Sequence, residues 1–197
     1  IARDYDIEPD VSAACYFYAL AAATGKWAMV KRMRKESLQG DMKFIKLLEK
    51  MGCTVSWERD GRQNLWLKGP DGKLKGMEVK MSDFSDQALT LAAIAPFADS
   101  EVTITGIAHI RGQESDRIKV IVDELAKMGI LCNELPDGVK IHPGTPKNTN
   151  IETYNDHRVA MSFAVTGLAG DGMTILNPMC CKKTFAGFFD EIDRLEE

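Results

Sequence analysis

The ionisable residues of this 197-residue chain gather in short stretches that could bind an anion and move protons. The stretch YNDHRVAMSFAV places Asp156, His157 and Arg158 side by side where an apolar segment begins. The stretch IRGQESDRIKV holds Glu114 and Arg117, whose spacing of three puts two side chains on one face of a helix. Guanidinium groups bind phosphate or carboxylate, and Asp, Glu and His transfer protons. These residues therefore predict a site for a phosphorylated or polycarboxylate substrate.

Other charged residues stand at comparable points of the chain, where simpler roles remain open. Asp10, Asp86 and Asp156 all occur at expected helix starts, and N-capping is an ordinary role for Asp there. For Asp10 we expect only capping, whereas Ser85 could cap in place of Asp86 and leave that carboxylate available as a base. Three simpler alternatives also stand: a solvated ion pair for Glu114 and Arg117, a helix cap for His157, and a surface position for Lys183.

The composition of the chain argues against several classes of protein. Lys and Arg number 25 against 29 Asp and Glu, so the net charge of −4 provides no general attraction to nucleic acid or to an anionic membrane. The longest apolar run, Val11 to Ala23, is too short to span a bilayer, and we recognise no signal peptide. The five cysteines lack CxxC spacing, which favours reduced thiols and a cytoplasmic location.

The sequence contains no spacing typical of a bound metal or nucleotide cofactor, and we expect none. The histidines His109, His142 and His157 are scattered, without an HxH or HExxH pattern. Neither GxGxxG nor GxxxxGK[ST] occurs. The adjacent Cys180 and Cys181 could form a redox or metal site, but small buried side chains are the favoured interpretation.

Three similar segments recur along the chain and would position the charged groups. Each one opens with Asp, continues as an apolar helix, breaks at Gly or Asp and ends in a β-rich stretch; the opening residues Asp10, Asp86 and Asp156 are 76 and 70 positions apart. A second, amphipathic helix follows each time, expected at residues 40–51, 114–128 and 183–195. Two short strands close the first two copies. We expect a βαβαββ unit twice in full and once without its last strands, with repeats near residues 1–70, 76–145 and 149–197.

The first helices of the repeats predict the architecture. Residues 11–23 and 159–168 are apolar nearly all the way round, which indicates burial on every side. Three buried helices wrapped by sheets and outer helices make an inside-out α/β barrel in a single domain. Their N-terminal ends would share one end of the core, where helix dipoles and unpaired N–H groups attract anions. We expect the strands missing from the third repeat to come from elsewhere in a longer chain.

Five motifs in this order extend the interpretation: SDQALT, GQESDRI, YNDHRVAMSFAV and PMCCKKTF, preceded by LQGDMKF. Together they closely resemble the 5-enolpyruvylshikimate-3-phosphate synthase family over essentially the whole chain. The resemblance implies two inside-out α/β domains, each of three βαβαββ units, with residues 1–197 similar to the C-terminal one. It also implies transfer of the enolpyruvyl group of phosphoenolpyruvate to the 5-hydroxyl of shikimate 3-phosphate, in aromatic amino acid biosynthesis, without metal or organic cofactor.

The resemblance implies roles for individual residues. Asp86 matches the base near the 5-hydroxyl, and Glu114 matches the group that delivers a proton to the methylene carbon. Phosphoenolpyruvate would be bound by three cations, with one histidine beside them in the catalytic set: Arg117, Arg158, Lys183 and His157.

Two positions depart from the pattern of the family. Gln113 stands where the family often has Lys, and His109 stands where Asn commonly contacts shikimate 3-phosphate. Both side chains still donate hydrogen bonds, so we count them among the substrate-binding residues.

The family is about twice as long as this chain, and its N-terminal substrate-binding residues have no counterpart here. We therefore expect the missing N-terminal domain as a partner, and negligible turnover by the chain alone. One alternative is an enzyme like UDP-N-acetylglucosamine enolpyruvyltransferase, which uses related chemistry but usually relies on a cysteine in the domain absent here. Another is a non-catalytic anion-binding or scaffolding domain. RNA 3′-phosphate cyclases share the repeat unit, but an acidic chain without a basic stripe disfavours them.

Overall fold

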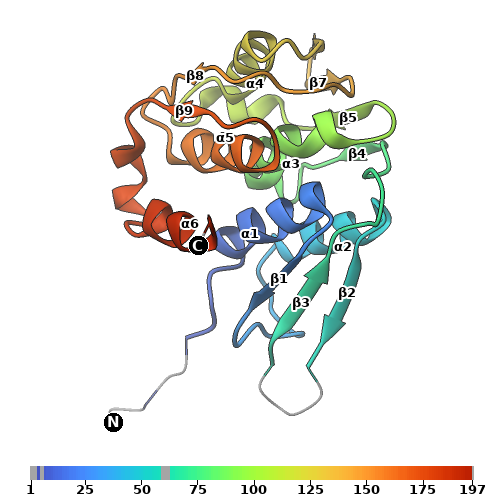
Figure 1. Cartoon of the computed structure of the whole chain (residues 1–197), viewed down its shortest axis with the longest axis vertical. Helices are drawn as coiled ribbons and strands as arrows, with labels where there is room; N and C mark the ends of the chain where they lie inside the picture. The colour runs from blue at the N-terminus through green and yellow to red at the C-terminus, as the bar shows by residue number, and fades with distance from the viewer. Residues whose placement is uncertain (1–3, 5–6, 59–62, 197) are drawn as a thin grey trace.

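The computed structural model describes residues 4, 7–58 and 63–196, and its elements follow the repeats (Figure 1). The first repeat holds α1 (Val11–Thr24), β1 (Trp27–Val30), α2 (Met42–Lys50), β2 (Thr54–Trp57) and β3 (Leu65–Lys68). The second holds β4 (Glu78–Lys80), the 3₁₀ helix η1 (Ser85–Gln87), α3 (Ala88–Ile94), η2 (Ala95–Phe97), β5 (Val102–Thr105), η3 (Ala108–Gly112), α4 (Arg117–Lys127), β6 (Cys132–Leu135) and β7 (Gly138–Ile141). The third holds β8 (Asn150–Ile151), α5 (His157–Ala169), β9 (Thr174–Ile175), η4 (Pro178–Lys183) and α6 (Phe188–Glu196).

The strands form one sheet per repeat. The first sheet has the order β1-β3-β2 and is antiparallel. The second has the order β4-β5-β7-β6, in which β4 and β5 are parallel and the other pairs antiparallel. The third is the parallel pair β8 and β9. The βαβαββ unit is thus seen in full in the second repeat. In the first repeat the expected opening strand falls largely on residues outside the described ranges, and residues 7–10 form no strand.

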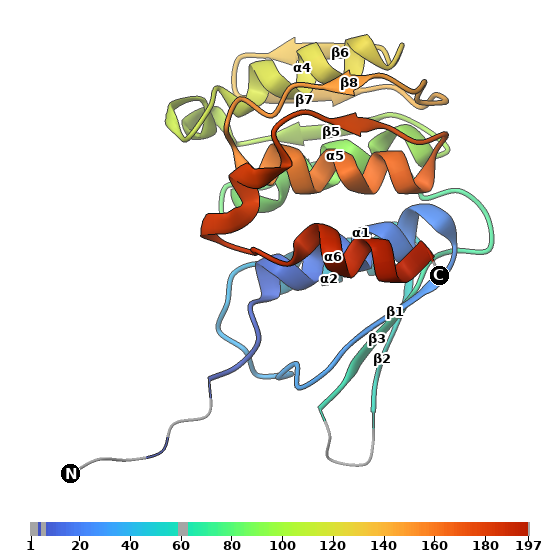
Figure 2. The ribbon, with the colours of Figure 1, turned by 60° about the vertical axis from the view of Figure 1, so that its left-hand side comes forward.

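The first helices of the repeats form the interior, as their apolar sequences predict. Each of α1, α3 and α5 contacts the other two. In Figure 2, α1 and α5 lie between the sheet of the first repeat and the strands of the second. All seven residues of α3 are buried. A backbone carbonyl satisfies one buried hydroxyl in this interior, which would be costly if left unpaired: Thr166 Oγ1 donates to Ala93 O at 2.8 Å, from α5 to α3.

The second helices have one buried face. In α2 the buried residues are Phe44, Ile45, Leu47 and Leu48, while the three lysines of the helix are exposed. Both α2 and α4 are followed by a left-handed glycine, Gly52 with φ 105° and Gly129 with φ 78°. Glycine is the usual residue at this cap position, so the Met-Gly pairs Met51-Gly52 and Met128-Gly129 mark the ends of the two helices, and the cap turns the chain toward the following strand.

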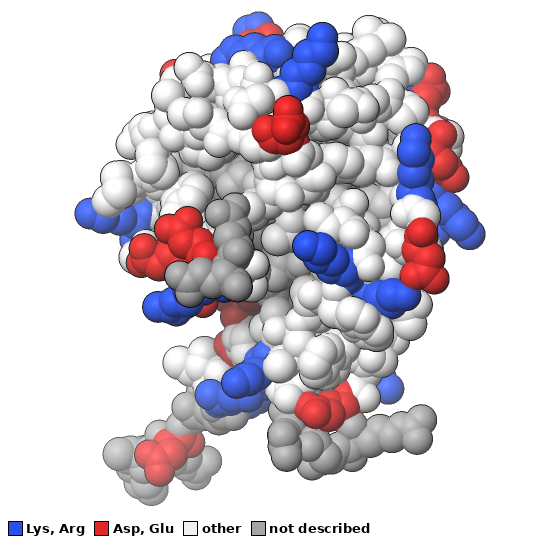
Figure 3. All heavy atoms as spheres, in the orientation of Figure 1, with Lys and Arg blue, Asp and Glu red and all other residues white. Residues whose placement is uncertain are grey.

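The N-terminal ends of the helices share one side of the molecule. In Figure 2 the starts of α1, α5 and α6 all lie toward the left, next to the turns that precede them. The face seen in Figure 3 carries acidic and basic side chains of the described residues interspersed around a largely uncharged centre. Among the described residues, no helix combines the length and the apolar character needed to cross a bilayer.

Candidate active site

Asp86 and Arg158 form the first half of the site, although they are 72 residues apart. The guanidinium Nη2 of Arg158 lies 3.0 Å from Asp86 Oδ2. The side chain of Arg158 is 15% exposed and that of Asp86 is 44% exposed, so a largely buried cation orients a carboxylate that solvent and ligands reach. This carboxylate caps no helix. The alternative in which Ser85 caps the helix is not formed either, because Ser85 begins η1 and its hydroxyl lies 2.8 Å from His109 Nε2.

Glu114, His157 and Lys183 form the second half. Lys183 Nζ donates to Glu114 Oε1 at 2.6 Å, and His157 Nδ1 lies 2.9 Å from Glu114 Oε2. Glu114 is about one-third exposed, whereas His157 is buried. Burial lowers the pKa of His157 below its ordinary value, although the charge of Glu114 opposes that shift. A neutral imidazole therefore sits beside a carboxylate that also contacts an ammonium group.

Arg117 and Asp156 form a buried ion pair beneath these groups. Asp156 is fully buried and accepts from Arg117 Nε at 2.8 Å and from Nη2 at 3.2 Å. Burial alone would raise the pKa of Asp156, but the hydrogen bonds and charge of Arg117 hold the pKa below its usual range. The same carboxylate caps α5 by accepting from the backbone N–H of Arg158 at 3.0 Å, and it accepts from Ser115 Oγ at 2.9 Å. Asp156 is therefore both a helix cap and an anchor for Arg117.

The expected shared helical face of Glu114 and Arg117 is wrong in detail. Helix α4 begins only at Arg117, with Asp116 as its N-cap, so Glu114 lies in the preceding bend. Neither the solvated ion pair nor a common helix face is formed: Glu114 turns to Lys183 and Arg117 turns to Asp156. The two residues still reach one site, because α5 brings His157 and Asp156 between them.

These groups surround one open hollow of about 490 Å³, lined by Asp86, Gln113, Glu114, Arg117, His157 and Arg158. Gln113 Oε1 accepts a hydrogen bond from Arg117 Nη1. Both residues line the hollow, so the Gln113 amide covers one side of the Arg117 guanidinium there. His109 is exposed on η3 and joins the site through Ser85. Lys183 joins it through Glu114.

A second hollow of about 540 Å³, between α1, β1 and the end of α6, has the opposite character. Its lining is mainly apolar, with Phe17, Leu20 and Trp27, and Lys26 is the charged side chain among its described lining residues. It lacks the convergent acids and bases that proton transfer needs. The smaller hollow is therefore the better candidate for chemistry.

Within the described residues, Glu114, Asp156 and His157 also place three potential metal-ligand atoms within 4.8 Å of one another. The carboxylate oxygens of this group already accept hydrogen bonds from Lys183 and Arg117. A divalent cation would have to displace both side-chain cations, so the donor set fits an anion site that contains cations better than a metal site.

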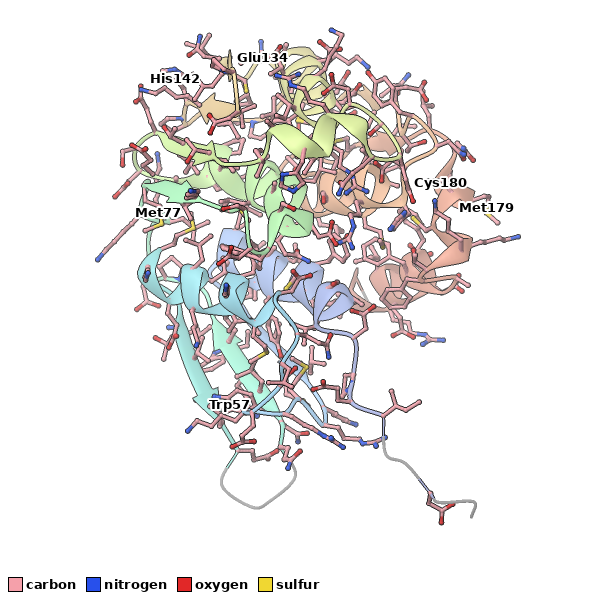
Figure 4. The ribbon with its side chains drawn as sticks, turned by 180° about the vertical axis from the view of Figure 1, so that it is seen from behind. Trp57, Met77, Glu134, His142, Met179 and Cys180 are labelled. Atoms are coloured by element: carbon pink, nitrogen blue, oxygen red, sulfur yellow. The ribbon has the colours of Figure 1, made fainter. Side chains whose placement is uncertain are left out.

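His142, Cys180 and Cys181 are not among the residues that line the hollow, although Cys181 Sγ donates to the backbone O of His157 at 3.8 Å. In Figure 4, Cys180 and Met179 of η4 lie on the opposite side of the molecule from His142 and Glu134. His142 contacts Glu101 and Asn133. Cys180 and Cys181 are buried free thiols, and burial raises the pKa of Cys181 to about 12. The structure supports the interpretation of this pair as small buried side chains.

Sequence reasoning missed the second role of Asp156 and the part played by Ser115. Asp156 was assigned to a helix start, and nothing in its position along the chain indicates the distant guanidinium that it binds. The spacing of Ser115, one residue after Glu114, was the available signal for a group close to the site.

Comparison with known proteins agrees with these observations. The sequence profile of a family described as EPSP synthase (3-phosphoshikimate 1-carboxyvinyltransferase) matches residues 1–192. A 3-phosphoshikimate 1-carboxyvinyltransferase of Nostoc punctiforme is 46% identical over 196 residues, which are 100% of this chain and 45% of that protein. A second such enzyme, from Halalkalibacterium halodurans, is 44% identical and covers 98% of this chain and 43% of the relative.

Solved structures give the same result. EPSP synthase from Acinetobacter baumannii superposes with a TM-score of 0.81 and 29% identity, over 95% of this chain and 46% of that one. The enolpyruvyl transferase NikO from Streptomyces tendae, with a TM-score of 0.73 and 18% identity, shares the fold. The chain spans less than half the length of the curated relatives that it matches. Its profile match and its α/β fold show that the chain belongs to the EPSP synthase (3-phosphoshikimate 1-carboxyvinyltransferase) family.

Proposed function

We propose that this chain supplies one wall of an enzyme that transfers the enolpyruvyl group of phosphoenolpyruvate to the 5-hydroxyl of shikimate 3-phosphate. The observation that carries the proposal is the meeting of two carboxylates, Asp86 and Glu114, with cations from the third repeat around one hollow. The reaction needs both features: a doubly anionic reactant must be held, and protons must move at two atoms of that reactant pair.

Arg158 and Lys183 are the cations that we assign to phosphoenolpyruvate. Arg158 lies at the N-terminal end of α5, where the helix dipole adds to its charge. Lys183 is half exposed and rests on Glu114, from which an incoming phosphate or carboxylate could attract it. Arg117 is the third cation that we assign to phosphoenolpyruvate: it is 4% exposed, Asp156 anchors it, and it lines the hollow.

Asp86 and Glu114 are the groups that we assign to proton transfer. Asp86 takes the proton of the 5-hydroxyl as that oxygen bonds to C2 of phosphoenolpyruvate. Glu114, in its protonated form, adds a proton to the C3 methylene, which gives a tetrahedral adduct. The Glu114 carboxylate left by this step then takes a proton from the new methyl group as the C–O bond to phosphate breaks, which forms the enolpyruvyl ether and restores protonated Glu114; Asp86 returns its proton to the departing phosphate. His157, 2.9 Å from Glu114, holds that carboxylate in place through both steps.

We further propose that residues 1–197 form the C-terminal domain of a two-domain protein, an inside-out α/β barrel of three repeats near residues 1–70, 76–145 and 149–197. Support comes from the mutual contacts of α1, α3 and α5 and from the share of each relative that the chain matches. The other domain would close the hollow over both substrates. The chain alone would supply only one wall of the site, so we expect it to form negligible enolpyruvyl product.

A ligand titration followed by NMR tests the proposal. Phosphoenolpyruvate is expected to shift the side-chain resonances of Arg158 and His157, and shikimate 3-phosphate those of Asp86 and His109. UDP-N-acetylglucosamine serves as the control ligand and is expected to shift none of them. If neither shikimate 3-phosphate nor phosphoenolpyruvate perturbs Asp86, Glu114 or Arg158, the chain is a scaffold, and a response to the nucleotide sugar alone would favour the sister enzyme.

A further inference from the structure

The turn directly before the site residues of α5 has an unfavourable backbone. Tyr154 has φ 52° and Asn155 has φ 57°, so two consecutive residues with side chains are in the left-handed region. Asn tolerates this conformation, but Tyr adopts it rarely. Two such residues in a row persist only where the surroundings hold them.

Helix α4 contacts this turn and the residue before it through Glu124. The hydroxyl of Tyr154 donates to Glu124 Oε1 at 2.8 Å, and the backbone N–H of Glu152 donates to Glu124 Oε2 at 3.3 Å. Glu124 is fully buried, and its charge is balanced by Lys127 Nζ at 2.7 Å. A buried carboxylate in the third turn of a helix is costly unless every oxygen is satisfied, and here the partners of both oxygens include this turn.

The same helix also holds the residue that follows the turn. Arg117 and Glu124 are seven positions apart, which is two helical turns, so both project from the same face of α4. Arg117 binds Asp156 and Glu124 binds Tyr154, on either side of Asn155. The turn is therefore fixed at two points by one rigid element.

The backbone conformation of the turn determines where the next three side chains point, and each of them makes a contact in the site. Immediately after it, Asp156 meets Arg117, His157 meets Glu114 and Arg158 meets Asp86. A rotation at Tyr154 would displace all three side chains together, because they are consecutive.

We propose that Glu124 and Tyr154 are positioning residues, which hold the left-handed turn and so aim His157 and Arg158 into the site. They touch no reacting atom. Their importance for phosphoenolpyruvate binding rests on the proposed function, but their effect on His157 does not. Loss of the Tyr154 hydroxyl should therefore change the surroundings of His157 even in the free protein.

The test compares Tyr154→Phe with Tyr18→Phe. Each removes one hydroxyl, but that of Tyr18 donates to Leu65 O at 3.1 Å, between α1 and β3 and away from the turn. The pKa of His157 is measured by NMR without ligand. Tyr154→Phe is expected to raise it toward the ordinary value of about 6.5, because the ring becomes better solvated, while Tyr18→Phe leaves it unchanged. Affinity for phosphoenolpyruvate should fall about tenfold in Tyr154→Phe alone, as for one hydrogen bond to a charged group.

The outcomes separate the two proposals. An unchanged pKa of His157 in Tyr154→Phe, with an unfolding midpoint equal to that of the unmodified chain, would overturn the positioning role. Equal changes of the pKa of His157 in Tyr154→Phe and Tyr18→Phe would also overturn it. If the unmodified chain binds no phosphoenolpyruvate, the proposed function fails, but the pKa of His157 still decides the positioning role. Should Tyr154→Phe not fold, Glu124→Gln and Glu124→Leu replace it: Gln keeps an acceptor and should preserve the pKa of His157, whereas Leu should raise it.

Discussion

The starts of α1 and α5 contain the same motif with different consequences. Asp10 and Asp156 each cap a buried helix, but Asp10 is exposed, and its side-chain partners among the described residues are the N–H groups of Ser12 and Ala13. Asp156 is fully buried and also binds a guanidinium. The contrast teaches that a repeated cap becomes part of a site only where a neighbouring helix supplies charge.

The first residue of the second helix is the source of the difference. Helix α2 begins with Met42 and α4 with Arg117, each preceded by Asp. In the first repeat that preceding residue, Asp41, accepts from Ser12 Oγ at 2.5 Å and from Gln87 Nε2 at 2.7 Å, which joins helices to one another. In the second repeat Arg117 reaches across to the third. The first position of the second helix thus holds Met42 in a structural corner and Arg117 in the site.

The largest difference between the two helix starts is expected in how much each Asp contributes to the stability of the fold. Asp156→Ala removes the closest carboxylate of the buried Arg117 and leaves it only the more distant Asp86 Oδ1, at 3.6 Å, so it should lower the free energy of unfolding by about 3 kcal/mol. Asp10→Ala removes only a cap and should cost about 1 kcal/mol. Urea unfolding of both variants measures the difference, and equal losses would show that Asp156 is a cap and nothing more.

The next effect is on anion binding. Arg158→Ala removes the guanidinium at the start of α5 and should weaken binding of phosphoenolpyruvate by about 10- to 100-fold, as expected for charge-assisted hydrogen bonds. Arg111→Ala is the matched control, since Arg111 pairs with Glu134 at 2.6 Å outside the hollow and should leave the affinity unchanged. Calorimetric titration measures both. Similar affinities for the two variants would contradict the assignment.

The start of α5 should also respond to pH. The folded pKa of His157 is lowered, so the unfolded chain binds its proton first as the pH falls. The contribution of His157 is therefore complete above pH about 6.5 and is lost as the pH falls from there toward the folded pKa. The free energy of unfolding, measured between pH 7 and pH 5, should fall more steeply in the unmodified chain than in His157→Gln. Identical slopes would rule out this burial effect.

The smallest effect is expected on the outer face of α4. Lys119 and Asp123 form an exposed pair at 3.0 Å, two residues from the buried Arg117. Lys119→Ala should change the free energy of unfolding by less than about 0.5 kcal/mol. A loss above roughly 1 kcal/mol in urea unfolding would mean that the outer face of α4 contributes more than surface ion pairs usually do.

The periodicity of the chain predicts most of the fold. Apolar residues on every side of residues 159–168 indicate a buried helix, and the Met-Gly pairs indicate where α2 and α4 end. These signals are local, because each depends on residues within one or two turns. The same local rules failed at Glu114, where a 3₁₀ helix and a bend precede α4 and redirect the side chain.

The site was predicted in its members but not in its pairings. Asp86, Glu114, His157 and Arg158 do meet, yet the partner of each lies 43 to 72 residues away in sequence, and no spacing rule reports such distances. The sequence did not indicate the left-handed backbone of Tyr154 either. The hydrogen bond of its hydroxyl to Glu124, and not the intrinsic preference of tyrosine, holds that conformation.

The contact between Glu114 of the second repeat and His157 of the third tests the central claim most directly. The carboxylate raises the pKa of the imidazole against the effect of burial. Glu114→Gln should therefore lower the pKa of His157 further, as measured by NMR titration of the ring, while Glu134→Gln, in β6 and paired with Arg111 outside the hollow, should not change it. An unchanged pKa of His157 in Glu114→Gln would contradict the account, because the two repeats would then not converge on one site.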